Sequence, residues 1–107
     1  MTLQELQQRS YEQAKKSGWC DRPVEIPEQV ALIHSEASEA LEAFRNNEPL
    51  CWTDAQGKPQ GVGSEYADAL IRIGHYCELL GIDLNAEVER KMAYNALRSF
   101  RHGGKAI

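Results

Sequence analysis

The helical repeat of apolar residues between positions 27 and 44 limits what this chain can fold into more than any other feature of its sequence. Apolar side chains recur there at helical spacing, at Val30, Ile33, Ala37, Leu41 and Phe44. Pro27 suits the first turn of a helix, and Glu28 suits its positive end. We therefore predict a long helix whose apolar stripe belongs to the hydrophobic core.

Two carboxylates of this helix, Glu36 and Glu39, lie off the apolar stripe. Residues three apart on a helix share one face, so these two side chains are neighbours. Leu32 and Ala43 lie on the same side of the helix, which argues against a plain solvent face. We therefore expect the helix to bury two faces, with the carboxylates between apolar neighbours.

A second carboxylate pair with the same spacing, Glu65 and Asp68, occurs in another helix-forming segment. Two such helices side by side would bring four carboxylates together, and their mutual repulsion calls for a positive charge between them. A hard divalent cation such as Mg²⁺ prefers oxygen ligands of this kind. The two pairs together predict a metal site, whereas each pair alone is weak evidence because acidic helix faces are common.

Capping residues predict three further helices. The expected N-cap residues are Thr2, Ser64 and Asp83. Thr2 and Glu5 have the spacing of a capping box, and Gly18 and Gly81 are suited to end the helices that precede them. The last helix is expected to run to about residue 100.

One long segment between these helices, residues 46–63, is rich in Pro, Gly, Asn, Asp and Gln. Such a composition predicts an irregular loop, and a loop this long in a small domain is often functional. It contains Trp52, a costly side chain to leave in a loop without a role. No strand pattern is found, so the expected fold class is all-α with four helices.

Two polar stripes follow the predicted third and fourth helices. The apolar stripe of the third helix comprises Tyr66, Ala69, Leu70, Ile73, Cys77 and Leu80, and the polar stripe beside it comprises Glu65, Asp68, Arg72 and His75. The fourth helix carries Lys91, Asn95 and Arg98 on one face, and a basic tail follows at residues 101–105. Acidic groups for a cation and basic groups for an anion are the composition of a metal–phosphate site.

The bulk composition fits one small soluble domain. The chain has 107 residues and a net charge of −4, which argues against a partner that is a nucleic-acid polymer. A domain of this size buries a modest fraction of its surface, so shared burial in an oligomer is consistent with its size. Three unpaired cysteines favour a reducing, cytoplasmic location over a disulfide framework or a zinc site. The polar N-terminus and the lack of a long apolar run predict no signal peptide and no membrane partner.

Histidines and tryptophans give weaker signals. His34 and His75 are expected to be polar residues at helix edges. No Glu-x-x-His occurs, so the pattern of di-iron carboxylate bundles lacks half of its ligands. Trp19 and Trp52 suit either a core or interface anchor or a platform on which a nucleobase stacks, and stacking is slightly favoured.

The order of these motifs resembles a known family. The matching residues are Glu36 and Glu39, then after 25 intervening residues Glu65 and Asp68, and later Lys91 and Asn95. The carboxylate pattern is similar to the signature of the MazG-type all-α nucleoside triphosphate pyrophosphohydrolases. The final helix and the Gly-Gly-Lys tail are similar to the end of MazG-like proteins. The similarity covers residues 27–105 and is weaker in the first helix and in the loop around Trp52.

The resemblance implies a single MazG-like domain over residues 1–107, with a helical bundle completed by a second copy in a homodimer or homotetramer. It implies the Mg²⁺-dependent conversion of a nucleoside triphosphate and water to the monophosphate and pyrophosphate, with Mn²⁺ as a substitute metal. The implied metal ligands are Glu36, Glu39, Glu65 and Asp68. The implied phosphate-binding residues are Lys91, Asn95 and Arg98. Lys105 in the basic tail and Trp52 in the loop are further candidate substrate-binding residues, from charge and from the stacking capacity of the indole. Glu39, which lies furthest from the apolar stripe, is the hypothetical general base.

Two other functions stay open on the sequence alone. The chain could be a non-catalytic helical interaction module, although the presence of all four carboxylates argues against a degenerate relative. It could also be a subunit that senses a nucleotide or a metal without turnover. If it is an enzyme, a specificity for dUTP or dCTP and a broad housecleaning of the nucleotide pool are both compatible with the sequence.

Overall fold

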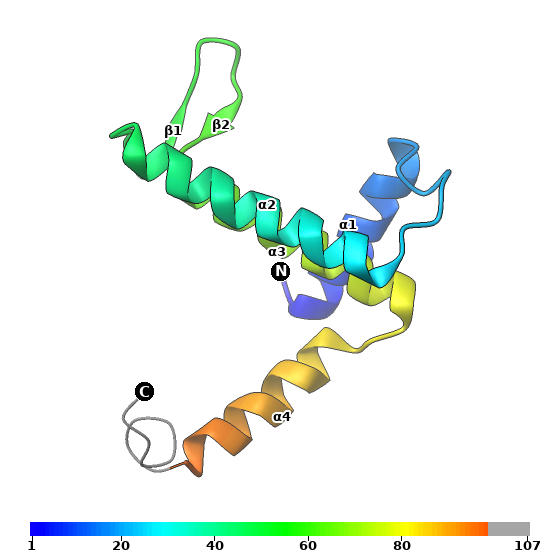
Figure 1. The fold of residues 1–107 in the computed structure, drawn as a ribbon. Helices are drawn as coiled ribbons and strands as arrows, with labels where there is room; N and C mark the ends of the chain where they lie inside the picture. Colours follow the sequence, from blue (N-terminus) through cyan, green and yellow to red (C-terminus); the bar gives the residue numbers. More distant parts are fainter. Residues whose placement is uncertain (99–107) are drawn as a thin grey trace.

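The computed structural model describes residues 1–98, and within them the chain forms four helices and one small hairpin (Figure 1). The elements in chain order are α1 (Leu3–Lys16), α2 (Ile26–Arg45), β1 (Trp52–Thr53), β2 (Pro59–Gln60), α3 (Val62–Leu80) and α4 (Leu84–Ala96). The mostly helical class is therefore confirmed. Helix α4 ends at Ala96, so the prediction that the last helix runs to about residue 100 was wrong by about one turn. The predicted substrate-binding residue Lys105 lies outside the described residues.

The helices form an open arrangement. Helices α2 and α3 lie side by side and run in opposite directions, and α1 crosses α3 (Figure 1). Helix α4 leaves the end of α3 and projects away from this group, and its main packing partner is α1. The radius of gyration is 16.4 Å, against about 13 Å for a compact chain of about 100 residues.

Local signals explain most helix ends. Thr2 and Glu5 form the predicted capping box at the start of α1, and Asp83 caps α4 by accepting from the backbone of Ala86. Gly81 ends α3 in the left-handed conformation, at φ 71°. The predicted cap at Ser64 was wrong, because α3 begins two residues earlier and the Ser64 hydroxyl donates to the Pro59 carbonyl instead.

The start of α3 depends on Gly61. This residue has a φ of 100°, which side chains rarely tolerate. A β-carbon there would also lie 2.5 Å from the Leu50 carbonyl oxygen. Glycine therefore lets the chain turn tightly from the hairpin into α3, four residues before Glu65.

The segment expected to be an irregular loop contains the antiparallel pair β1–β2, so the prediction of no strands was wrong there. Asp54 closes the turn between the two strands. Its Oδ1 accepts the backbone N–H groups of Gln56 and Lys58 at 2.9 Å each. Its Oδ2 accepts the side-chain amide of Gln60 at 3.0 Å. A carboxylate that bonds its own turn gives order to a segment whose composition suggests none.

Gln7 connects α1 to the turn between α3 and α4. Its buried side-chain amide donates to Glu78 Oε1 at 3.0 Å and to the Ile82 carbonyl oxygen at 2.6 Å. Its side-chain carbonyl oxygen, Oε1, accepts the backbone N–H of Leu84 at 3.1 Å. Three hydrogen bonds from one side chain therefore hold the first turn of α4 against α1.

Helices α1 and α3 approach closely at Gly74, where a β-carbon would lie 3.2 Å from Ser10 Oγ and 3.4 Å from Gln7 Cα. We expect Gly74→Val to lower the free energy of unfolding by about 1–3 kcal/mol because the extra atoms overpack this contact. Urea denaturation measures the change. Gln8→Val, at an exposed position of α1, controls for the helix propensity of valine, and an equal effect in both variants would contradict the packing argument.

The apolar stripe predicted to be core is largely uncovered within one chain. Val30, Ala37, Leu41 and Phe44 are exposed, and Ile33 is half-buried. The buried positions of α2 are instead Gln29, Glu36, Ala40 and Ala43. The assignment of this stripe to the core of the single chain was therefore wrong. A helical period identifies an apolar face but not what covers it.

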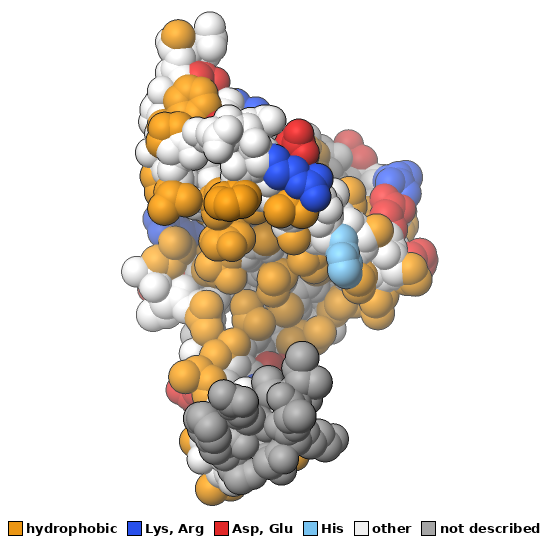
Figure 2. All heavy atoms as spheres, turned by 60° about the vertical axis from the view of Figure 1, so that its left-hand side comes forward, with side chains coloured by type: hydrophobic (Ala, Val, Ile, Leu, Met, Phe, Trp, Pro, Cys, Tyr) orange, Lys and Arg blue, Asp and Glu red, His pale blue; other side chains and the backbone are white. Residues whose placement is uncertain are grey.

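In helix α3, as in α2, predicted core residues are exposed and predicted polar residues are covered. Its predicted polar stripe faces the other helices in part: His75 is buried, and Glu65 and Arg72 are half-buried. Its predicted apolar stripe includes exposed Tyr66, Leu70 and Leu80. Figure 2 shows hydrophobic side chains gathered over a broad area of the surface between the hairpin and α4. We give the name α2–α3 apolar face to five of the exposed apolar residues of these two helices: Val30, Leu41, Phe44, Tyr66 and Leu70.

Candidate metal centre

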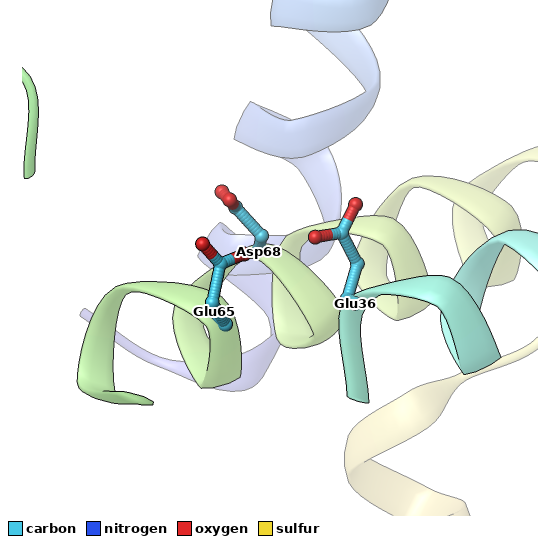
Figure 3. Close-up of side chains that lie close together, drawn as sticks. All are labelled: Glu36, Glu65 and Asp68. Carbon is cyan, nitrogen blue, oxygen red and sulfur yellow. The ribbon is translucent and has the colours of Figure 1, made fainter. Parts of the chain in front are cut away.

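Three carboxylates from two helices converge beside the α2–α3 contact. Glu36 comes from α2, and Glu65 and Asp68 come from the first turns of α3 (Figure 3). One oxygen from each residue lies within 4.8 Å of the others. The i, i+3 spacing on α3 gives Glu65 and Asp68 one face, and the packing of α2 brings Glu36 to it. Three of the four carboxylates that the sequence predicted to lie together therefore do so, and Glu39 is the exception.

Two oxygens of this cluster are buried without a hydrogen-bond partner among the described residues. They are Glu36 Oε2 and Glu65 Oε2. A buried carboxylate oxygen without a partner is costly, and a bound cation would supply what it lacks. The oxygen-only donor set fits a hard divalent ion such as Mg²⁺ or Mn²⁺, although the cluster does not by itself identify the ion.

Arg72 supplies the one cation paired with the cluster in the described part of the chain. Its Nε donates to Glu36 Oε1 at 2.8 Å, and the side chains are 24% and 8% exposed respectively. Glu36 is thereby held by one oxygen, which leaves the other directed to the cluster. One guanidinium against three carboxylates leaves the site with an excess of negative charge.

Burial and crowding raise the pKa of two of these acids. Burial raises the pKa of Glu65 to about 7, and a side-chain hydrogen bond with Glu39 and the neighbouring charges of Glu39, Asp68 and Glu36 act in the same direction. Partial desolvation of the exposed Asp68 and the charge of Glu36 also raise the pKa of Asp68, against the opposite influence of Arg72 and Lys58. Both shifts show that negative charge is disfavoured here until a cation is added.

Glu39 is exposed and lies outside the group of three, although it is close enough to Glu65 to raise its pKa. The structure therefore places Glu39 beside the cluster rather than among its closest oxygens. Such a position leaves its carboxylate accessible to water.

The shift at Glu65 predicts how stability depends on pH in the absence of divalent ions. Its pKa is about 7 in the folded chain against an ordinary value of 4.5. Between these values the folded state keeps a proton that the unfolded state has released, so stability falls as pH rises. Relative to Glu65→Gln, we expect the wild-type thermal midpoint to decrease from pH 5 to pH 7; the lowered pKa of His75 acts in the opposite direction, but equally in both proteins. Added Mg²⁺ should raise the midpoint more at pH 8 than at pH 5, and an equal gain at both would contradict the site.

The predicted phosphate-binding residues of α4 do not adjoin the cluster within one chain. Lys91 and Asn95 are exposed on the projecting helix α4, and Arg98 is exposed two residues beyond its end. Lys91 lines a pocket with Glu87, Arg90 and Tyr94, all from α4 itself. None of the charges that shift the pKa values of Glu65 and Asp68 belongs to a described residue of α4.

The indole of Trp52 is anchored by a hydrogen bond within its own segment. Its indole N–H donates to Glu48 Oε1 at 2.9 Å, and the residue is 38% exposed on β1. The hairpin instead contributes Lys58, whose charge acts on Asp68. The sequence analysis gave Lys58 no role, and only its place in the folded hairpin relates it to the cluster.

His75 was expected at a helix edge but is buried, so that prediction was wrong. Burial and the charge of Arg72 lower the pKa of His75. Its Nε2 lies 3.8 Å from Cys20 Sγ, and its ring lies 4.9 Å from that of Tyr76.

Arg72 also lies over Trp19, with its guanidinium carbon 5.8 Å from the ring centroid. The sequence placed Arg72 in the polar stripe of α3 without showing that it contacts both Glu36 and Trp19.

Comparison with known proteins adds no further identification: no protein-family model, no curated protein and no solved structure matches the chain. The helices within residues 1–98 include none that is both long and apolar enough to cross a membrane. Cys20, Cys51 and Cys77 are free thiols in this part of the chain.

Proposed function

We propose that the chain is a Mg²⁺-dependent nucleoside triphosphate pyrophosphohydrolase of the MazG type. The observation that carries the proposal is the convergence of Glu36, Glu65 and Asp68, with two buried oxygens that lack partners among the described residues. The order and spacing of the carboxylates in the sequence support the same assignment. The reaction adds water at the α-phosphorus, breaks the bond to the β-phosphate oxygen, and releases a monophosphate and pyrophosphate.

The residues would divide the work as follows. Glu36, Glu65 and Asp68 would hold the ion, and Arg72 would keep Glu36 turned toward it. When bound, Mg²⁺ supplies positive charge against the triphosphate and makes a nearby water more acidic. Glu39, exposed beside Glu65, would accept the proton of the attacking water.

We further propose that the active form is a homo-oligomer, a dimer or a tetramer. The α2–α3 apolar face leaves large side chains in water, with Phe44 68% and Tyr66 65% exposed. Only five hydrophobic residues are buried within the described chain, which is a small core for a domain of this size. A second copy that packs its own α2 and α3 on this face would supply the missing burial.

The oligomer also gives the projecting α4 a role. Lys91 and Asn95 on this helix, and Arg98 just beyond its end, would reach the phosphates only when a second copy brings a carboxylate cluster to them. The fixed positive charges would then oppose the charge of the departing pyrophosphate. Lys105 would join them from the tail.

A panel of ribo- and deoxynucleoside triphosphates with Mg²⁺ tests the proposal. Release of pyrophosphate together with the monophosphate is expected, rather than orthophosphate and the diphosphate. Nucleotide binding without turnover would favour a sensing subunit instead. Neither binding nor turnover would favour a helical interaction module. The same panel would decide between narrow dUTP or dCTP specificity and broad housecleaning.

A further inference from the structure

A pocket of about 290 Å³ is lined in part by Arg72, the residue that pairs with Glu36 of the carboxylate cluster. Its walls include the indole of Trp19, the apolar Leu32, and the polar groups of Arg72, His75 and Tyr76. Small-molecule sites in proteins fall at about 300–1,000 Å³, so this volume suits one flat ring system rather than a whole nucleotide. Arg72 is shared by the pocket and the cluster, and the two sites are therefore adjacent.

Trp19 offers an aromatic surface at the mouth of this pocket. The residue is 59% exposed, although its ring already lies over the Arg72 guanidinium. A large exposed indole beside a cavity is suited to stacking, and base–aromatic stacking is tolerant of base identity. Trp19 therefore provides affinity for a nucleobase but no selection among bases.

Selection requires donors or acceptors that are not already used, and Arg72 has them. Its Nε donates to Glu36 Oε1, and its Nη1 donates to the Tyr76 hydroxyl at 3.3 Å. A guanidinium has five N–H groups, so three have no partner among the residues that the structure describes. The contacts with Glu36 and Tyr76 hold the group in place, so the remaining donors meet a ligand with little loss of side-chain freedom.

We propose that this pocket takes the base of the nucleotide, and that Arg72 selects bases with two adjacent hydrogen-bond acceptors. Guanine presents O6 and N7, which arginine binds with two parallel hydrogen bonds. Cytosine presents O2 and N3 in the same relation. Adenine places an amino donor next to N7, and uracil places the N3 donor between its oxygens, so each opposes one arginine N–H. This inference rests on the proposed function for the position of the triphosphate.

Binding of nucleoside monophosphates tests the selection without any hydrolysis. Calorimetric titration with GMP, AMP, CMP and UMP is expected to show tighter binding of GMP than AMP and of CMP than UMP, by about tenfold in each pair. Arg72→Lys keeps the charge but loses the planar fork, and both ratios should fall toward one. Arg9→Lys, at an exposed position of α1, should keep both ratios.

Trp19→Ala separates affinity from selectivity. It should weaken all four monophosphates together while the two ratios stay as in the wild type. Equal affinities for the four bases, no binding of any of them, or ratios unchanged by Arg72→Lys would each overturn the inference. Selective binding without pyrophosphate release would instead defeat the proposed reaction and leave the base pocket standing. Circular dichroism of each variant checks that its helices are intact.

Discussion

Asp68→Asn is expected to reduce pyrophosphate release by about 100-fold or more, because it replaces a charged carboxylate ligand of the proposed ion with a neutral amide. Asp68 is the best residue for this test, since it is exposed and has no ion pair in the described chain. The folded state should therefore tolerate the change. Rates measured across a range of Mg²⁺ concentrations would show whether higher metal restores part of the activity.

Glu36→Gln is a less clear test of the same site. It would also weaken the buried pair with Arg72, and disrupting such a pair costs about 3–5 kcal/mol. A loss of activity would then mix a missing ligand with a less stable fold. Glu12→Gln, at an exposed position of α1, removes one carboxylate charge elsewhere and should leave the rate unchanged. A wild-type rate and Mg²⁺ dependence in Asp68→Asn would reject the metal site.

The second large effect concerns assembly. Leu41→Asp should convert the oligomer to a monomer, because it places a charge in the middle of the α2–α3 apolar face, where Leu41 is 51% exposed in the single chain. Burying an unpaired carboxylate in an apolar contact costs several kcal/mol, enough to dissociate a modest interface. Light scattering after size-exclusion chromatography measures the mass directly.

Leu50→Asp is the matched control, since Leu50 is 68% exposed but lies outside both helices. It should keep the wild-type mass. If Leu41→Asp also kept that mass, the second copy would have to pack elsewhere. If the wild type were itself a monomer at assay concentrations, the proposal for the apolar face would be wrong. Stability should depend on protein concentration in the wild type and not in Leu41→Asp, as mass action requires.

Local chemistry made several parts of the fold predictable. The capping box of Thr2 and Glu5 and the left-handed Gly81 act within one turn, so a short window of sequence contains their cause. The carboxylate pair of α3 was also predictable as a pair, because helical spacing alone places Glu65 beside Asp68. These features need no knowledge of what packs against the helix.

Features that depend on tertiary packing were not predictable in this way. The same periodicity fits a stripe buried in one chain and a stripe left for a partner, which is why Leu41 and Phe44 were assigned to the core. Asp54 orders its hairpin through bonds that composition does not reveal. The role of Arg72 depends on the distances from α3 to Glu36 and Trp19, residues that are 36 and 53 positions away in the sequence.

The three hydrogen bonds of Gln7 have a consequence for the whole molecule. They fix the angle at which α4 departs, so the path of the basic helix is set by a residue near the start of the chain. Helix α1 carries none of the proposed metal or phosphate ligands, yet it sets the distance between the basic side chains of α4 and the other helices of the same chain. In an assembly of identical copies, that distance would determine which neighbouring copy these basic side chains contact.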